Sequence, residues 1–144
     1  MSSRRSLICF LVVSALLLAG YISAQIISAQ IRWVSAYNPG DQNVGQPFST
    51  HACTFWNIVG GSKAGETKFY VNTLHEVGPS SGWCNAVDSL PPLYGTYLDS
   101  TDTYVSHNIS TSGTYQFTAT SYIVYKGSTK AGPKSGSSGN FQVK

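Results

Sequence analysis

The stretch Thr114–Tyr125, TYQFTATSYIVY, alternates two kinds of side chain along its length. Gln116, Thr118 and Thr120 form a polar series at every second position. Successive side chains of a β-strand point to opposite sides of the sheet, so this pattern predicts a strand with one buried face. The face expected inside carries Tyr115, Phe117, Ala119, Ser121, Ile123 and Tyr125.

Other segments rich in aromatic and β-branched residues also predict strands. Clusters of Gly, Pro, Asn, Asp and Ser separate them, as expected for turns. The sequence therefore predicts an all-β fold, an antiparallel β-sandwich of about six to eight strands. The further strand candidates are Ile31–Tyr37, Phe48–Val59, Thr67–Leu74, Thr103–Ile109 and Asn140–Lys144.

The segment 126–140 reads KGSTKAGPKSGSSGN, which is the composition of a linker. We predict that it forms a long flexible loop between the last two strands. Three of its residues are lysines, which could meet a phosphate or an acidic glycan, although solubility alone explains them.

Ser112–Phe117, SGTYQF, resembles the start of strand F in immunoglobulin-like domains, where Ser-Gly-Thr-Tyr-x-Cys places a tyrosine at a corner. Phe117 stands where those domains carry cysteine, and Thr111 stands where they carry aspartate. The resemblance implies an immunoglobulin-like or fibronectin-type secreted β-sandwich that is not an antibody domain.

A second resemblance concerns the overall layout. Gly45 and Phe48 come early, a Thr/Ser/Gly-rich edge follows, and the chain ends on a Phe-Gln-Val strand. This plan is similar to that of small fungal secreted sandwich domains associated with the cell wall.

The N-terminal residues 1–24 have the pattern of a secretory signal peptide. Arg4 and Arg5 precede an apolar run, Leu7–Ala19, that is shorter than the roughly 20 residues needed to span a bilayer. Cleavage could follow Gly20, Ala24 or Ala29, and residues alone do not choose between them. An uncleaved signal anchor is the alternative. We expect a secreted, extracellular protein with no membrane span after cleavage.

The 144-residue chain then leaves one domain, residues 25–144. Only 10% of the chain is charged, and the expected mature part has seven basic and six acidic residues, a net charge of +1. Nucleic-acid binding calls for a clustered basic surface, so we expect no nucleic-acid partner. The oligomeric state stays open.

Cys53 and Cys84 are the cysteines of the expected mature chain. In an oxidising secretory route an even pair most simply forms one disulfide bond. The sequence therefore predicts a Cys53–Cys84 bridge.

Three patterns invite a catalytic or metal-binding interpretation. Gly78–Gly82, GPSSG, fits the G-x-S-x-G motif but lacks its strand-turn-helix context. The three histidines, at 51, 75 and 107, match no zinc or copper spacing. Asp99 and Asp102 could be paired glycosidase carboxylates, yet a turn explains them better. We predict no catalytic residues, no metal site and no cofactor.

Exposed aromatic side chains are the remaining candidates for a binding site. Tyr and Trp combine an apolar ring with a polar edge, so they can stack on a sugar or anchor a protein. The candidate binding residues are Trp83, Tyr94, Tyr97 and Tyr104, and their alternative role is packing along the sheets. Asn108-Ile109-Ser110 is an N-glycosylation sequon, used or unused.

These observations predict a secreted, non-catalytic binding or structural module that acts at an extracellular or cell-wall surface. Its partner would be an extracellular glycan or protein. One alternative is a small secreted hydrolase or metal-dependent enzyme. A further alternative is a secreted effector, toxin or inhibitor.

Overall fold

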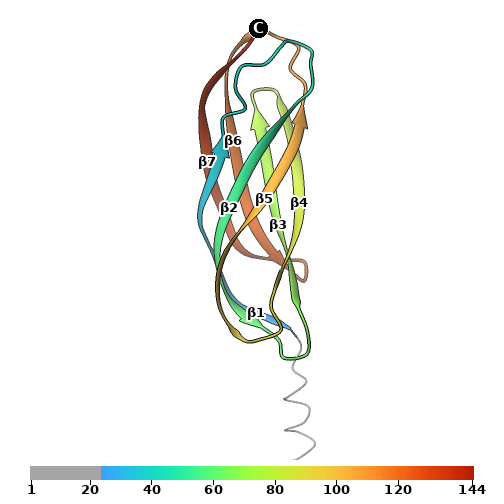
Figure 1. Cartoon of the computed structure of the whole chain (residues 1–144), viewed down its shortest axis with the longest axis vertical. Coiled ribbons are helices and arrows are strands. Elements are labelled where there is room, and N and C mark those ends of the chain that lie inside the picture. The colour runs from blue at the N-terminus through green and yellow to red at the C-terminus, as the bar shows by residue number, and fades with distance from the viewer. Residues whose placement is uncertain (1–23) are drawn as a thin grey trace, which may run out of the picture.

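The computed structural model describes residues 24–144, which form seven strands in two antiparallel sheets (Figure 1). The three-stranded sheet has the order β1-β2-β5, with β1 at Gln25–Tyr37, β2 at Phe48–Gly61 and β5 at Gly95–His107. The four-stranded sheet has the order β4-β3-β6-β7. Its strands are β3 (Thr67–Val77), β4 (Ser80–Leu90), β6 (Gly113–Tyr125) and β7 (Ser128–Val143).

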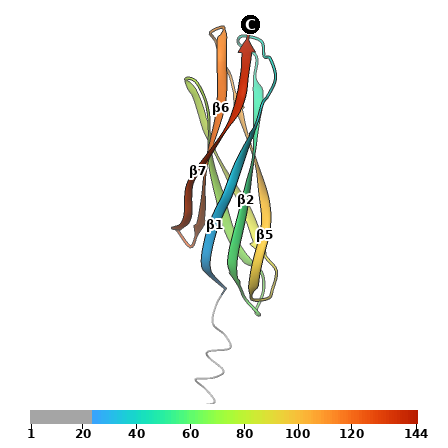
Figure 2. The same ribbon diagram turned by 90° about the vertical axis from the view of Figure 1, so that its left-hand side faces the viewer.

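The two sheets pack as the layers of an elongated sandwich (Figure 2). Consecutive strands form hairpins within a sheet at β1-β2, β3-β4 and β6-β7, while the chain changes sheet between β2 and β3, β4 and β5, and β5 and β6. In immunoglobulin constant-type domains the fourth strand joins the first sheet, whereas here β4 pairs with β3. The predicted class, an antiparallel immunoglobulin-like β-sandwich, is confirmed.

Strand β6 has the alternation expected from its sequence. Phe117, Ala119, Ser121 and Ile123 are fully buried between the sheets, and Thr118, Thr120 and Tyr122, which alternate with them, are half-buried. Across the interior, the Trp56 ring meets Phe69 edge to face, with ring centroids 5.2 Å apart. The core therefore forms where the inward faces of both sheets meet.

The corner before β6 is a tyrosine corner. The Tyr115 hydroxyl donates a hydrogen bond of 2.9 Å to the backbone carbonyl of Thr111, four residues upstream. Phe117, at the position of the missing cysteine, packs its ring against buried His75 with centroids 4.9 Å apart. This ring contact lies within the four-stranded sheet, whereas the disulfide of antibody domains joins the two sheets.

The prediction of a flexible loop at 126–140 is wrong. Lys126 and Gly127 both have positive φ, 48° and 74°, and form a tight two-residue hairpin into β7. The small residues of β7 have a packing role, because a Cβ on Gly136 would lie 1.9 Å from the carbonyl oxygen of Val34 on β1. The Gly- and Ser-rich composition of this segment indicated a linker, but glycine is present here because the backbone of β7 lies close to that of β1.

Two further segments differ from expectation. Ser80–Leu90 forms β4, which the Ser/Asn/Gly-rich sequence did not indicate because this edge strand buries little of its surface. Asp99 and Asp102 lie inside β5, not in a turn. Alternation alone would place them on opposite faces because they are three residues apart, but Asp99 is exposed and lines a hollow with Trp33 and Phe55 of the outer face.

The predicted Cys53–Cys84 disulfide is also wrong, since both thiols are free. Cys53 lies on the outer side of the three-stranded sheet, because its neighbour Thr54 points inward to Ser121. Cys84 pairs in register with fully buried Thr73 and faces the interior from the other sheet. The three-stranded sheet thus lies between the two thiols, and they cannot be bridged without moving backbone.

The predicted signal peptide, residues 1–24, lies outside the described residues except for Ala24, whose carbonyl accepts a hydrogen bond from the Tyr125 hydroxyl. Within residues 24–144, no helix has the length and apolar character to cross a membrane.

We predict that Cys53 and Cys84 both react with a maleimide when the folded protein is purified without reductant and then denatured. Reductant should leave the midpoint of thermal unfolding unchanged, because there is no bridge to break. Mass spectrometry after alkylation measures the thiols. A Cys53–Cys84 crosslink in the peptide map would contradict the structure.

Candidate functional site

The outer side of the three-stranded sheet carries the largest set of exposed aromatic side chains. The strand register aligns them in rows across β1, β2 and β5. One row holds Trp33 and Phe55, and a second holds Tyr37, His51 and Tyr104. We call this surface the aromatic face and define it as Trp33, Tyr37, Phe55, Leu98 and Tyr104.

The rings of the aromatic face stack on one another along the rows. Tyr37 and Tyr104 both stack on the central His51 ring, each with centroids 4.5 Å apart. Trp33 stacks on Phe55 at the same distance. Stacked rings cover much of each other's faces, so they turn mainly their edges and the outer faces of the end rings to solvent.

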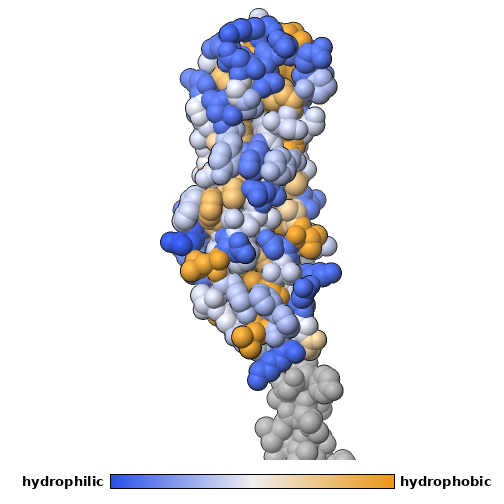
Figure 3. Space-filling model, viewed as in Figure 1, coloured by the Kyte–Doolittle hydropathy of each residue, from blue (hydrophilic) through white to orange (hydrophobic). Residues whose placement is uncertain are grey.

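Much of this face is nevertheless accessible. Leu98 is 61% exposed and Tyr104 is 58% exposed. Figure 3, viewed from the side on which β2 and β5 lie in front, shows apolar residues as separate orange patches among white and blue ones. Tryptophan and tyrosine rank near the middle of the hydropathy scale, so an aromatic surface is pale in such a view.

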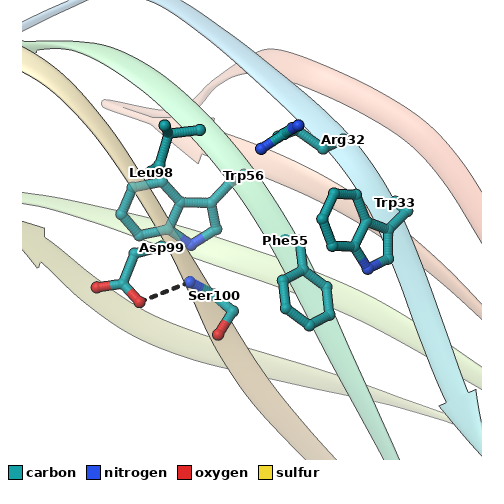
Figure 4. Close-up of a pocket in the computed structure, with 7 residues that line it drawn as sticks. All are labelled: Arg32, Trp33, Phe55, Trp56, Leu98, Asp99 and Ser100. Atoms are coloured by element: carbon teal, nitrogen blue, oxygen red, sulfur yellow. Dashed lines mark hydrogen bonds between the residues drawn. The ribbon is translucent and has the colours of Figure 1, made fainter.

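A hollow of about 280 Å³ opens at one end of the face (Figure 4). Arg32 and Asp99 lie on its opposite sides, one from β1 and the other from β5. The Arg32 guanidinium lies over the Trp33 ring, 5.1 Å from the centroid, and Asp99 accepts a 2.8 Å hydrogen bond from the Ser100 amide. The hollow combines an apolar floor with one positive and one negative group. Its lining residues are Arg32, Trp33, Phe55, Trp56, Leu98, Asp99 and Ser100.

The centre of the face is polar. His51 Nε2 and Asp102 Oδ1 are 2.7 Å apart, an ion pair when the ring is protonated. Cys53 lies beside them, and burial, together with the carboxylates of Asp102 and Asp99, raises the pKa of its thiol. The thiol therefore stays protonated and is a poor nucleophile.

The strands that form this sheet have a distinctive charge composition. β1, β2 and β5 contain no lysine and no glutamate, and their charged residues are Arg32, Asp99 and Asp102. Protein interfaces are depleted of Lys and Glu and enriched in Trp, Tyr and Arg. The residue composition of this sheet is thus similar to that of protein interfaces.

The four predicted binding residues do not form one group. Tyr104 belongs to the aromatic face, whereas Trp83 lies on the outer side of the four-stranded sheet. Tyr97 packs against the core and donates a 2.7 Å hydrogen bond to the Leu93 carbonyl. Tyr94 lies in the loop between β4 and β5 and is 40% exposed.

Trp33, Tyr37, Phe55 and Leu98 were not predicted as site residues. Trp33 and Tyr37 fall within a correctly predicted strand, at positions that alternation places on one side. Phe55 lies on a strand whose inward positions include Thr50 and Thr54, so polarity does not distinguish its two faces. An apolar residue at an outward position would have indicated the site. That pattern can be identified only when the strand register is known.

A chain of hydrogen bonds runs through the interior at the other end of the sandwich. Ser80 Oγ lies 2.8 Å from His107 Nδ1, and His107 Nε2 lies 2.9 Å from Thr50 Oγ1. Thr50 Oγ1 lies 2.7 Å from His75 Nδ1, and His75 Nε2 lies 2.9 Å from Thr103 Oγ1. The chain joins β4 and β3 of one sheet to β2 and β5 of the other.

Neutral rings satisfy every member of this chain in more than one proton arrangement, because the Thr50 hydroxyl can donate either to His75 or to the Val105 carbonyl, 3.3 Å away. If both histidines are neutral with the proton on Nε2, Ser80 donates to His107, which donates to Thr50. Thr50 then donates to His75, and His75 donates to Thr103. Thr103 completes the series, because its hydroxyl lies 3.4 Å from the carbonyl of Ala52.

Burial favours the neutral rings. It lowers the pKa of His75 to about 4, with smaller contributions from His107 and His51. Burial also lowers the pKa of His107. A buried imidazolium would lose its hydration without gaining a carboxylate partner, so both rings resist protonation.

Ser80 also lines a polar hollow of about 450 Å³ with Asn108 and Thr111. The G-x-S-x-G serine thus has a histidine within hydrogen-bond distance. The third group in this chain is the neutral Thr50, where catalytic triads place a carboxylate that stabilises the imidazolium. The arrangement fits a serine that caps a buried histidine.

The predicted metal candidates are also separated. His75 and His107 are linked through Thr50 inside the sandwich, whereas His51 lies on the outer side with Asp102. Among residues 24–144, no three His, Cys, Asp or Glu side chains gather in an arrangement that could hold a metal ion.

Comparisons with known proteins add little to this description. No family model matches the chain, and no curated protein is significantly similar in sequence. Among solved structures, the crystal structure of the CARDB domain of the PF1109 protein from Pyrococcus furiosus, in complex with di-metal ions, is 13% identical. It has a TM-score of 0.35 and covers 86% of this chain and 90% of that chain.

Two other solved structures are similarly distant. The solution structure of the same Pyrococcus furiosus domain has 13% identity and a TM-score of 0.33, covering 81% of this chain and 91% of that one. Pseudomonas fluorescens alkylpurine DNA glycosylase AlkC, bound to DNA with an abasic site analog, has 13% identity and a TM-score of 0.35. That match covers 90% of this chain and 33% of the glycosylase chain. The fold class rests on the strand order described above.

We predict that the protein loses stability as the pH falls from about 6.5 to about 4. In this window the His75 side chain binds a proton in the unfolded state but stays neutral in the folded state. His75 alone therefore lowers the free energy of unfolding by about 3 kcal/mol. Urea unfolding across this pH range measures the slope. His75→Gln should flatten it, and an unchanged slope in that variant would contradict the neutral buried histidine.

Proposed function

We propose that this protein is a non-catalytic binding module that recognises another protein through the aromatic face. The observation that carries the proposal is the set of rings that the register of β1, β2 and β5 aligns on one accessible surface. Trp, Tyr and Arg are the residues that most often dominate binding energy at protein interfaces. Trp33, Tyr37, Tyr104 and Arg32 supply all three types.

The stacking of the rings favours a protein over a sugar at this surface. A pyranose ring binds against an open aromatic face, whereas the rings of Tyr37, His51 and Tyr104 cover each other. Ring edges and the Leu98 side chain instead offer apolar contacts of irregular shape. The partner should place an acidic group near Arg32 and a basic group near Asp99 or Asp102, because opposite charges give an interface its register.

The proposed place of action is outside the cell, at a cell surface or wall. The signal-like residues 1–24 and the sequon support it. Asn108 is exposed in the loop between β5 and β6, where an attached glycan would meet solvent. Cleavage after Ala24 suits the fold better than cleavage after Ala29, since residues 25–29 pair with the end of β2 and contribute buried Ile26.

The second candidate function is hydrolysis at Ser80, favoured by its 2.8 Å contact with His107. Catalysis would require His107 to accept the serine proton and become an imidazolium in the interior. Burial lowers the pKa of this histidine, which makes it a weak base. The binding function is therefore preferred.

The proposal predicts that the tagged protein captures an extracellular protein that can be identified and then bound directly. With that purified partner, Trp33→Ala and Tyr104→Ala should each weaken binding at least about tenfold, because central aromatic anchors contribute more than 1 kcal/mol. Surface plasmon resonance gives the dissociation constants.

Trp83→Ala is the matched control, because it removes an exposed aromatic side chain from the opposite sheet. It should leave the affinity for the protein partner unchanged, and circular dichroism should show that all three variants fold. Affinity that survives both Trp33→Ala and Tyr104→Ala would refute the aromatic face as the binding surface.

A further inference from the structure

The outer side of the four-stranded sheet carries a second, smaller hollow, of about 230 Å³. Strands β4, β3 and β6 bring Trp83, Asn72 and Tyr122 together there, and Asn72 pairs in register with Tyr122. Val124 and Thr129 complete the lining. This site lies on the other sheet from the aromatic face and shares no residue with it.

The two rings at this hollow are arranged differently from those of the aromatic face. Trp83 and Tyr122 have centroids 6.0 Å apart and planes inclined at 40°, so they do not stack face to face. Trp83 is 55% exposed. An inclined pair of this kind leaves ring surface open to a ligand, and a flat apolar ring is the surface against which the C–H groups of a sugar pack.

The polar groups beside the rings suit hydroxyl ligands. The Asn72 carbonyl oxygen is buried and has no hydrogen-bond partner among the described residues. An amide offers both donors and an acceptor, and Thr129 adds a hydroxyl. The unpartnered Asn72 side-chain oxygen is closed off from solvent, so it meets a ligand hydroxyl when the side chain turns toward the hollow.

The size and charge of the hollow restrict the ligand further. None of the five lining residues is charged, so nothing there compensates a carboxylate, sulfate or ammonium group. Sites for drug-sized ligands occupy about 300–1,000 Å³, and this hollow is smaller. We propose that the Trp83–Asn72–Tyr122 hollow binds one neutral sugar ring of an extracellular glycan.

The test is a glycan array probed with the intact protein, followed by calorimetric titration of the strongest neutral oligosaccharide. We expect neutral hexose glycans to bind, and Trp83→Ala and Asn72→Ala each to weaken binding at least about tenfold. Trp83→Phe, which keeps an aromatic ring, should recover part of the affinity. Tyr104→Ala, on the opposite sheet, should have no effect.

Failure of the sugar site can be distinguished from failure of the protein-binding function. Trp83→Ala is the control for protein binding, and Tyr104→Ala is the control for sugar binding. Absence of binding to any neutral glycan, binding of acidic glycans only, or binding that survives Trp83→Ala would overturn the sugar site. Each result leaves the measurement on Trp33 and Tyr104 unaffected.

Discussion

The hydrogen-bond chain from Ser80 through His107, Thr50 and His75 to Thr103 crosses the space between the sheets without a charge. Buried polar groups stabilise a fold only when each has a partner, and this chain meets that condition when both imidazoles are neutral. It fixes how β2 and β5 lie on β3 and β4. These buried polar side chains therefore hold the two sheets together.

A second polar cluster extends the same arrangement along the sandwich. Ser121 of β6 lies 2.7 Å from Thr54 and 2.9 Å from Thr73, hydroxyl to hydroxyl. The Trp56 indole donates to Thr101, which donates to Asp88. Inward threonines and serines thus connect the sheets at several levels, while Trp56, Phe69 and Phe117 supply the apolar contacts.

The two outer faces differ physically. On the three-stranded sheet, rings at paired positions of neighbouring strands stack, which covers much of their faces and leaves edges suited to a protein surface. On the four-stranded sheet, Asn72 stands between Trp83 and Tyr122, so the rings are inclined and an open wedge remains. A module with these two faces could hold a glycan and a protein at once.

The sequence predicts those parts of the fold that depend on local alternation. Thr114–Tyr125 has the expected inward and outward faces, and the Tyr115 corner forms as its resemblance implies. Prediction from sequence fails where contacts between distant segments determine the structure. Gly136 of β7 packs against β1, and the side of the sheet on which Cys53 lies depends on the strand register. For the same reason Tyr104 and Trp83 were recognised as exposed aromatics, while the grouping of Trp33, Tyr37 and Phe55 was not predictable.

The central physical claim is that the polar interior is neutral, so that the chain from Ser80 to Thr103 joins the two sheets without a buried charge. Nitrogen-15 NMR of the histidine side chains tests it directly by reporting which ring nitrogens carry protons. At pH near 6 a neutral interior predicts an unprotonated His75 ring and a His107 ring that is less protonated than a reference histidine in a model peptide. Rings at positions 75 and 107 that are protonated to the same extent as the reference would contradict it.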